Sequence, residues 1–412
     1  MNITRNPLLL IFLGTPFLIQ SCGDSNKTKE SKEVVYTLVE QPNKEFELDY
    51  ETAFDQIDGK YVEIDGTAYY TFFNRKNSSL YFYDYETGEL YHQTKMAKDG
   101  PDAVEYPYYF FDYYVHDFDN IFINTMAFYY RINKDGEVLK RIKPDDTSGF
   151  FSRKNIAIDG AMEYRDGKLY CGISQSVPAE GDTSWLRTVY NFDSETFEKE
   201  YVDERFLVPN YEEKARRLRE MAKTGGISSV STFFAGNAEE VYGSSAINDS
   251  LYHFVGSEFR GAYYAGDPEV EVTNLEGYFN KTKIETFEGG GISIGPKAIQ
   301  PAFYTEMLST PDNRYIYRIL IHGTKAKIEE GSDEERPEVF GATLTIFDTL
   351  TKTAGKIKLP VEELGITYYS TDVFVSRKGI HFPNKDIESE SLKSYKLYRV
   401  SSSETDLGRS VF

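Results

Sequence analysis

The sequence predicts an all-β fold, a β-propeller of about six blades with four antiparallel strands each and a short inserted surface helix. Three observations predict this fold. Aromatic residues, which suit pleated strands, make up 15% of the chain. A unit of two strands joined by a polar turn recurs along the sequence, and several strands, such as residues 80–83, are apolar on both faces. Blades that stack face to face bury both faces of their inner strands, which explains such a pattern.

The recurring unit is an aromatic-rich strand, a polar turn and a second strand. Its clearest copies span residues 79–91, 128–139, 188–199 and 342–359. The turns contain Asp, Asn, Thr and Gly, which cap the backbone or tolerate left-handed conformations. Strands of a second kind lie upstream of these units, at residues 60–64, 68–73, 120–124, 168–173, 250–254, 315–321, 372–375 and 379–382. These strands and units predict about six blades, and five or seven blades are the alternatives.

The ring is predicted to close through its two ends. The last unit, residues 372–400, contains only three strands, and residues 34–40 (VVYTLVE) form a strand without a blade of their own. We therefore expect the N-terminal strand to complete the last blade and to remove the open sheet edges.

Three stretches interrupt the strand pattern. Residues 210–223 place Leu218 and Met221 at helical spacing among charges, just before Gly225-Gly226, and predict the surface helix. Residues 324–337 are highly charged and predict a mobile loop. Residues 288–296 (EGGGISIGP) predict a glycine-rich loop.

The N-terminus predicts export and a lipid anchor. Arg5 precedes a short apolar run from residue 8 to 19, as in a secretory signal, and Ser21-Cys22 follows where the run ends. We expect residues 1–21 to be a lipoprotein signal peptide, residues 22–33 to be a lipidated Cys22 with a flexible tether, and residues 34–412 to form one propeller domain. The alternative is an ordinary signal peptide that is cut near Ser21.

Charge and cysteine content narrow the possible partners. The chain has a formal charge of −20, and removal of residues 1–21 would take away Arg5 and no acidic residue. Such a surface repels phosphate backbones and anionic headgroups, so we expect no nucleic acid partner and no purely electrostatic membrane binding. A lipidated Cys22 would leave Cys171 without a partner, so no disulfide is expected.

The lipobox-like Ser21-Cys22, the polar stretch after it and units such as residues 80–90 together resemble a lipoprotein family typical of Bacteroidota. This family is catalogued as domain of unknown function 4221. The resemblance covers the whole chain and is one of layout and not of an invariant motif. It implies a six-bladed, TolB-like propeller. It implies no activity and no functional residues.

Residue patterns that could carry chemistry mostly have structural interpretations. The sequence His116-Asp117-Phe118-Asp119-Asn120 could offer oxygens to calcium, but a turn that starts a strand is the favoured interpretation. None of the five histidines is paired at metal-ligand spacing, and Gly289-Gly290-Gly291 lacks the ending of a phosphate-binding loop. The aromatic cluster at residues 106–114 is interpreted as core, with sugar stacking as the alternative. We therefore expect no metal and no cofactor.

The favoured function is a binding or assembly module at the cell envelope, lipid-anchored and expected at the outer membrane, with the membrane side left open. Its partner could be a glycan, a peptide or another envelope protein, and the ligand is unknown. One alternative is a carbohydrate-active enzyme, a glycoside hydrolase or lyase that uses carboxylates in the propeller channel. A third possibility is a structural or sensory partner that acts through residues 210–223. No catalytic motif in the sequence favours an enzyme.

Overall fold

The structure of the protein is a computed structural model. The structure describes residues 34–52, 56–104, 110–125, 128–143, 162–172, 185–201, 232–272, 282–286, 292–296, 299–328, 335–366, 372–387, 389 and 391–403. Residues 1–33, with the predicted signal peptide, Cys22 and the tether, lie outside this set, and so does the predicted helix at residues 210–223.

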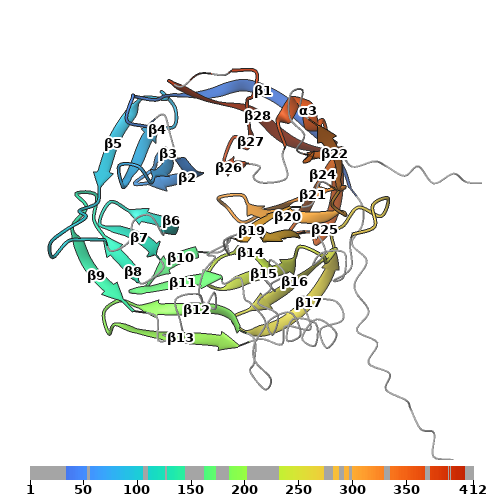
Figure 1. Ribbon diagram of the computed structural model, residues 1–412. Helices are drawn as coiled ribbons and strands as arrows, with labels where there is room; N and C mark the ends of the chain where they lie inside the picture. Colours follow the sequence, from blue (N-terminus) through green and yellow to red (C-terminus); the bar gives the residue numbers. More distant parts are fainter. Residues whose placement is uncertain are drawn as a thin grey trace, which may run out of the picture.

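Six four-stranded antiparallel sheets stand around a central axis as the blades of a propeller (Figure 1). Blades 1 and 2 consist of β2 (Gln56–Ile64), β3 (Thr67–Asn74), β4 (Ser79–Asp84) and β5 (Leu90–Lys95), then β6 (Phe110–Asp117), β7 (Asn120–Thr125), β8 (Tyr129–Ile132) and β9 (Val138–Ile142). Blades 3 and 4 consist of β10 (Met162–Arg165), β11 (Lys168–Gly172), β12 (Trp185–Asn191) and β13 (Thr196–Tyr201), then β14 (Thr232–Gly236), β15 (Glu240–Ser245), β16 (Ser250–Val255) and β17 (Glu258–Tyr264). Blades 5 and 6 consist of β20 (Phe303–Ser309), β21 (Tyr315–Ile321), β24 (Ala342–Asp348) and β25 (Thr353–Leu359), then β26 (Phe374–Ser376), β27 (Gly379–Pro383), β28 (Leu392–Ser403) and β1 (Val35–Glu47). The predicted fold class and blade count are therefore confirmed.

A side-chain cap recurs in the turns between the third and fourth strands of the blades. Asp84 Oδ1 accepts hydrogen bonds from the backbone N–H groups of Glu86 (2.9 Å) and Thr87 (2.8 Å). Asn191 and Asp348 cap the equivalent turns of blades 3 and 5 in the same way. Because this cap needs a short side-chain acceptor at the start of the turn, the polar turn recurs in the sequence as the fold requires.

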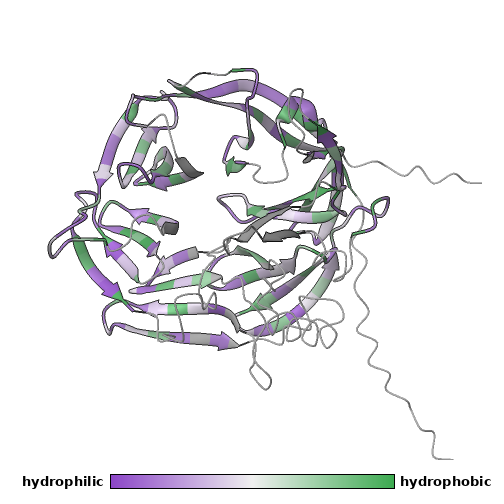
Figure 2. Ribbon diagram, viewed as in Figure 1, coloured by the Kyte–Doolittle hydropathy of each residue, from purple (hydrophilic) through white to green (hydrophobic). Residues whose placement is uncertain are grey.

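The core lies between the blades. Each of five clusters of buried apolar residues joins two neighbouring blades, and residues 80–83 of β4 are fully buried because they pack on both faces of their sheet. Figure 2 shows hydrophilic residues along the rim strands β1 and β5 and more hydrophobic ones on strands nearer the axis. Burial of a large apolar side chain stabilises the folded state by roughly 1.5–3 kcal/mol, so these junctions supply most of the stability.

The N-terminal strand closes the ring. β1 pairs antiparallel with β28 from Val35 opposite Ser403 to Glu47 opposite Leu392, with a bulge between Gln41 and Lys44. It is the fourth strand of blade 6, whose other three strands come from the C-terminal end of the chain. The predicted closure is confirmed, and the strand continues beyond residue 40 to Glu47.

Two predicted loops are wrong in part, because the structure contains hairpins there. β22 (Thr324–Ile328) pairs with β23 (Glu335–Val339) inside the predicted mobile loop, while residues 329–334 lie outside the described set. Glu338 holds this hairpin through ion pairs with Lys325 (3.0 Å) and Lys327 (2.7 Å). An exposed hairpin buries few apolar residues, so its sequence lacks the hydrophobic alternation that predicts a strand.

The predicted glycine-rich loop is corrected in the same way. β19 (Ile292–Pro296) pairs with β18 (Thr282–Thr286), so the second half of that stretch is a strand. The only helix among the described residues is the single turn α3 (Val361–Leu364), which the sequence did not predict.

Candidate ligand-binding channel

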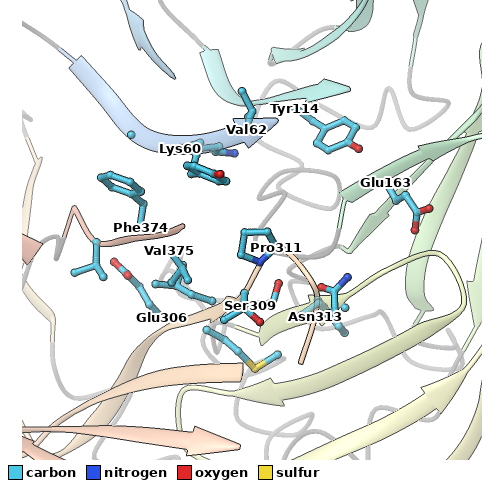
Figure 3. Close-up of a pocket in the computed structure, with 18 of the residues that line it drawn as sticks. Lys60, Val62, Tyr114, Glu163, Glu306, Ser309, Pro311, Asn313, Phe374 and Val375 are labelled. Atoms are coloured by element: carbon cyan, nitrogen blue, oxygen red, sulfur yellow. The ribbon is translucent and has the colours of Figure 1, made fainter. Parts of the chain in front are cut away.

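The centre of the ring contains a cavity of about 780 Å³. Its lining comes from the first strands of all six blades, β2, β6, β10, β14, β20 and β26, and from the turns that follow three of them. Figure 3 shows side chains from these strands around the cavity. A volume of this size is within the usual range of small-molecule sites, so the channel is the candidate functional site.

The described lining of this cavity contains more carboxylates than cationic side chains. It contains five carboxylates and two cationic side chains, namely Glu63, Asp112, Glu163, Glu306 and Asp372 with Lys60 and Arg377. Both cations form ion pairs with lining carboxylates, Lys60 with Asp112 and Arg377 with Glu63. The excess of carboxylates gives the channel a negative field, which a low-dielectric cleft focuses.

Lys60 and Asp112 link blades 1 and 2 at the channel wall. The Lys60 Nζ lies 2.5 Å from Asp112 Oδ1 and donates to the backbone oxygen of Tyr113 at 2.8 Å. It also lies 4.7 Å from the centre of the Tyr113 ring. The ammonium group therefore has a carboxylate, a carbonyl and a ring as partners, which fixes its position.

Glu63 and Arg377 link blades 1 and 6 near one end of the channel. Arg377 binds Glu63 through two nitrogens, with Nη2 at 2.6 Å from Oε2, and Tyr61 Oη donates to Glu63 Oε1 at 2.5 Å. The Arg377 guanidinium lowers the pKa of Glu63, while burial raises the pKa of Tyr61. Glu63 is therefore held as a carboxylate, and its bidentate contact with the Arg377 guanidinium is the geometry of a strong ion pair.

Asp372 connects the channel with the buried junction of blades 6 and 1. Lys393 lies 2.8 Å from Asp372 Oδ2, and Tyr395 donates a long hydrogen bond of 3.3 Å to the same oxygen. Burial raises the pKa of Tyr395 well above its usual value, so its hydroxyl remains a donor. Asp372 is thus the third carboxylate of the channel wall, after Asp112 and Glu63, that an ion pair holds in place.

The wall on the side of blades 3 and 4 contains Glu163. Its Oε2 accepts a hydrogen bond from the backbone N–H of Ala238 at 2.5 Å, and Tyr114 of β6 lies on the neighbouring part of the lining. Figure 3 shows Tyr114 and Glu163 on the same side of the cavity. The Glu163 charge also raises the pKa of Tyr114, after the larger effect of burial. The charge of the Glu163 carboxylate therefore acts on the hydroxyl group of Tyr114.

One turn contributes more residues to the cavity lining than the others, namely Thr310, Pro311 and Asn313. The turn between β20 and β21 has five residues, 310–314, whereas the equivalent turns of the other blades have two or three. Thr310 Oγ1 donates to Asp312 Oδ1 at 2.6 Å and accepts from the Tyr315 N–H at 3.0 Å. Pro311 is at the tip, among the lining residues in Figure 3. The internal hydrogen bonds of this turn therefore hold its part of the channel lining in place.

The structure separates the sequence-predicted candidates. In the aromatic cluster at residues 106–114, Tyr113 is core as predicted and Tyr114 lines the channel, while residues 105–109 lie outside the described set. The favoured turn at residues 116–120 is confirmed, because Asp117 accepts hydrogen bonds from the side chain of Asn120 and the N–H of Asp119. Gly289-Gly290-Gly291 and Cys22 lie outside the described residues.

Sequence reasoning missed the channel residues. Glu306 is the only charged residue in the first strand of blade 5, and Glu163 shares the short first strand of blade 3 with Arg165. A charge in a strand nearest the axis is the signal that could have identified them.

No group of three or more His, Cys, Asp or Glu side chains in the described part of the chain is arranged to hold a metal ion. None of the described helices is both long and apolar enough to cross a membrane.

Comparisons with known proteins identify relatives. The sequence model of a family described as a domain of unknown function (DUF4221) matches residues 35–253. The crystal structure of a DUF4221 member from Bacteroides vulgatus ATCC 8482 is similar, with a TM-score of 0.62 and 14% identity over 90% of this chain and 100% of that chain. A Bacteroides fragilis NCTC 9343 protein, named as exported, has a TM-score of 0.50 and 11% identity over 91% of this chain and 99% of its own. No curated protein matches the sequence. At such identities the similar structures establish a shared fold and nothing further.

Proposed function

This chain belongs to the DUF4221 family, and from that premise we propose that it is a lipid-anchored binding module of the cell envelope whose central channel holds a polar ligand. The ligand candidates remain glycans, peptides and segments of other envelope proteins. The single observation that carries the proposal is the cavity of about 780 Å³ that all six blades line.

The anchor and the location are supported by the N-terminal sequence. Residues 1–21 have the layout of a lipoprotein signal peptide, and Cys22 stands at the position that lipid would occupy. A protein of similar fold from Bacteroides fragilis is named as exported. We place the lipidated chain in the outer membrane, with residues 22–33 as the tether and residues 34–412 as the binding domain.

Charge-fixing contacts in the channel favour binding over catalysis. A general acid in a glycosidase needs a raised pKa, but Arg377 lowers the pKa of Glu63. Asp249, a carboxyl whose pKa burial raises, is not part of the channel lining. The lining rings of Phe233, Phe234 and Phe374 are buried among protein atoms, so they offer little free surface for stacking on sugars.

A carbohydrate-active enzyme is the second candidate, because five carboxylates line the same cavity. Two suitably spaced carboxyl groups are the chemical minimum for glycoside hydrolysis. This candidate predicts that a bound glycan is cleaved during incubation, whereas the binding module predicts that it is recovered intact.

A binding screen tests the proposal. The mature chain with Cys22→Ala is incubated with panels of glycans and peptides, and its melting temperature is measured. A ligand at a hundredfold excess over its Kd stabilises the folded state by about 2.7 kcal/mol. The shift should disappear in the channel variant Glu306→Gln and persist in Glu258→Gln, a surface residue paired with Arg260. A shift that both variants retain would place the ligand outside the channel.

A further inference from the structure

We infer that the channel ligand carries a positively charged amine or guanidinium group on a slender chain, which binds between Glu163 and Tyr114. This inference rests on the proposed binding function of the channel and names the chemistry of its ligand. Three features of the lining support it: the unequal number of charges, the surroundings of Glu163 and the long turn at residues 310–314.

The cations of the lining are already engaged with carboxylates. Lys60 pairs with Asp112, and Arg377 pairs with Glu63 through two nitrogens. Neither cation is positioned to receive an anionic ligand without giving up its carboxylate. Because the lining contains five carboxylates and only two cationic side chains, an anion would meet net negative charge and is a poor match for this channel.

Glu163 differs from the paired carboxylates of the lining. Glu163 accepts a hydrogen bond from the Ala238 N–H, a neutral donor, while its strand neighbour Arg165 forms an ion pair with Glu239 at 3.0 Å. Tyr114, half-buried on the adjacent blade, lies on the same side of the cavity (Figure 3). Burial raises the pKa of its hydroxyl, and the Glu163 charge raises it further. A carboxylate next to an aromatic ring is the combination that binds ammonium and guanidinium groups, through an ion pair and a cation–π contact.

The geometry favours an organic cation over a metal ion. Calcium and similar ions need several oxygen ligands that converge on one point, and the described residues provide no such group of three or more acidic, His or Cys side chains. An amine or guanidinium needs only one carboxylate and an adjacent ring, which Glu163 and Tyr114 supply.

The turn at residues 310–314 limits the width of the ligand. It is longer than its counterparts in the other five blades, and Pro311 and Asn313 line the cavity. The internal bonds of Thr310 hold the turn in place. A linear chain, such as a lysine side chain or a polyamine, fits beside this turn better than a branched ligand does.

Isothermal titration calorimetry on the Cys22→Ala mature chain tests the inference with four probes. They are the peptide Gly-Lys-Gly-Lys-Gly, the same peptide with both lysines acetylated, spermidine and a neutral glycan panel. We expect the lysine peptide or spermidine to bind and the acetylated peptide to bind at least tenfold more weakly. Which of the two cations binds more tightly tells a peptide source from a free polyamine.

Variants locate the site. Glu163→Gln can still accept the hydrogen bond from Ala238 and should weaken cation binding at least tenfold, while Glu258→Gln should leave it unchanged. If Glu163→Gln does not fold, Tyr114→Leu tests the ring side of the same site. Equal binding of the acetylated peptide, or full binding by Glu163→Gln, overturns the inference. Channel-dependent binding of a neutral glycan alone would overturn the cation and keep the proposed function, whereas no channel-dependent binding of any probe would overturn both.

Discussion

The hydroxyl groups of Tyr70 and Tyr395 lie 2.7 Å apart where the last blade meets the first, although 325 positions separate them in the sequence. Tyr70 belongs to β3 of blade 1, and Tyr395 belongs to β28, the strand that pairs with β1. Both side chains are fully buried, with ring centres 5.6 Å apart. Tyr395 also reaches Asp372 at the channel wall. The contact therefore couples closure of the ring to the lining of the channel.

Tyr395→Phe should lower the free energy of unfolding by about 1–3 kcal/mol, because the Tyr70 hydroxyl loses a buried partner. Urea denaturation measures the change. Tyr398→Phe, on the same strand but half-buried, should change the free energy by less than about 0.5 kcal/mol. Equal effects of the two substitutions would mean that the buried hydroxyl pair adds nothing to closure.

A pair of glycines separates the cost of a backbone conformation from the cost of a clash. Gly66 and Gly88 have nearly the same φ, +80° and +81°. A Cβ at Gly66 would meet nothing within 4 Å, but one at Gly88 would lie 2.3 Å from the backbone oxygen of Glu45 in β1. Gly66→Ala should therefore cost about 1 kcal/mol of stability, the cost of a left-handed alanine.

Gly88→Ala should cost that amount and about 1–3 kcal/mol more, because blade 1 would have to move away from β1. Thermal unfolding of the two variants under identical conditions provides the comparison. Similar melting temperatures would show that the close approach of turn and strand at this junction is easily relieved.

His381 should make stability depend on pH. It is fully buried, stacks on Phe374 with ring centres 4.1 Å apart, and its Nε2 lies 2.7 Å from the Tyr85 hydroxyl. Burial lowers its pKa to about 3. An unfolded histidine titrates near pH 6.5, so between about pH 6.5 and 3 the unfolded chain binds a proton that the folded chain does not bind.

The free energy of unfolding should consequently fall as the pH drops below about 6.5, by up to about 1.4 kcal/mol per pH unit from this residue. His381→Gln removes the titrating group, so the difference in stability between wild type and variant should shrink from pH 7 to pH 5. Urea titrations at the two pH values measure it. A difference that stays constant would argue against a buried neutral histidine.

Much of the fold could be predicted because its repeated parts have local sequence signals. Asp84, Asn191 and Asp348 cap equivalent turns, and each needs a short polar side chain at one position. β4 is buried on both faces, which requires an uninterrupted apolar run. The β22–β23 hairpin was missed because it is exposed and carries its stabilising contacts as ion pairs.

The channel could not be predicted for a different physical reason. Lys60, Asp112, Glu163, Glu306 and Asp372 come from five blades, and the curvature of the ring alone brings them together. No spacing in the sequence encodes that arrangement. Their strands also mix apolar residues, which pack between blades, with charged residues that face the cavity, so the alternation that predicts strands is weakened.

A buried arginine holds blades 4 and 5 together. Arg318 is 1% exposed, its Nη2 donates to the backbone oxygens of Ser245 (3.3 Å) and Asn248 (2.5 Å), and its guanidinium lies 3.5 Å from the centre of the Tyr304 ring. Arg318→Met keeps most of the apolar volume but leaves both carbonyls without this donor. Stability should fall by about 2–4 kcal/mol, measured by chemical denaturation.

The matched control for this variant is Arg260→Met. Arg260 is exposed and pairs only with its neighbour Glu258 at 2.8 Å among the described contacts, so its loss should cost less than about 1 kcal/mol. A stable Arg318→Met protein would mean that apolar packing at this junction can replace the buried cation.

The two cysteines give opposite expectations for membrane attachment. Cys22→Ala should release the protein into the soluble fraction, because each acyl methylene buried in a bilayer contributes about 0.8 kcal/mol and the polar residues 23–33 contribute no apolar surface in its place. Cys171→Ala removes the thiol buried between blades 2 and 3, so this variant should stay in the membrane fraction and lose only some stability. Fractionation of cells that express each variant, followed by immunoblotting, measures the distribution. Membrane retention of Cys22→Ala would remove the lipid anchor from the proposed function, whereas release of both variants would show that fractionation reports folding and not lipidation.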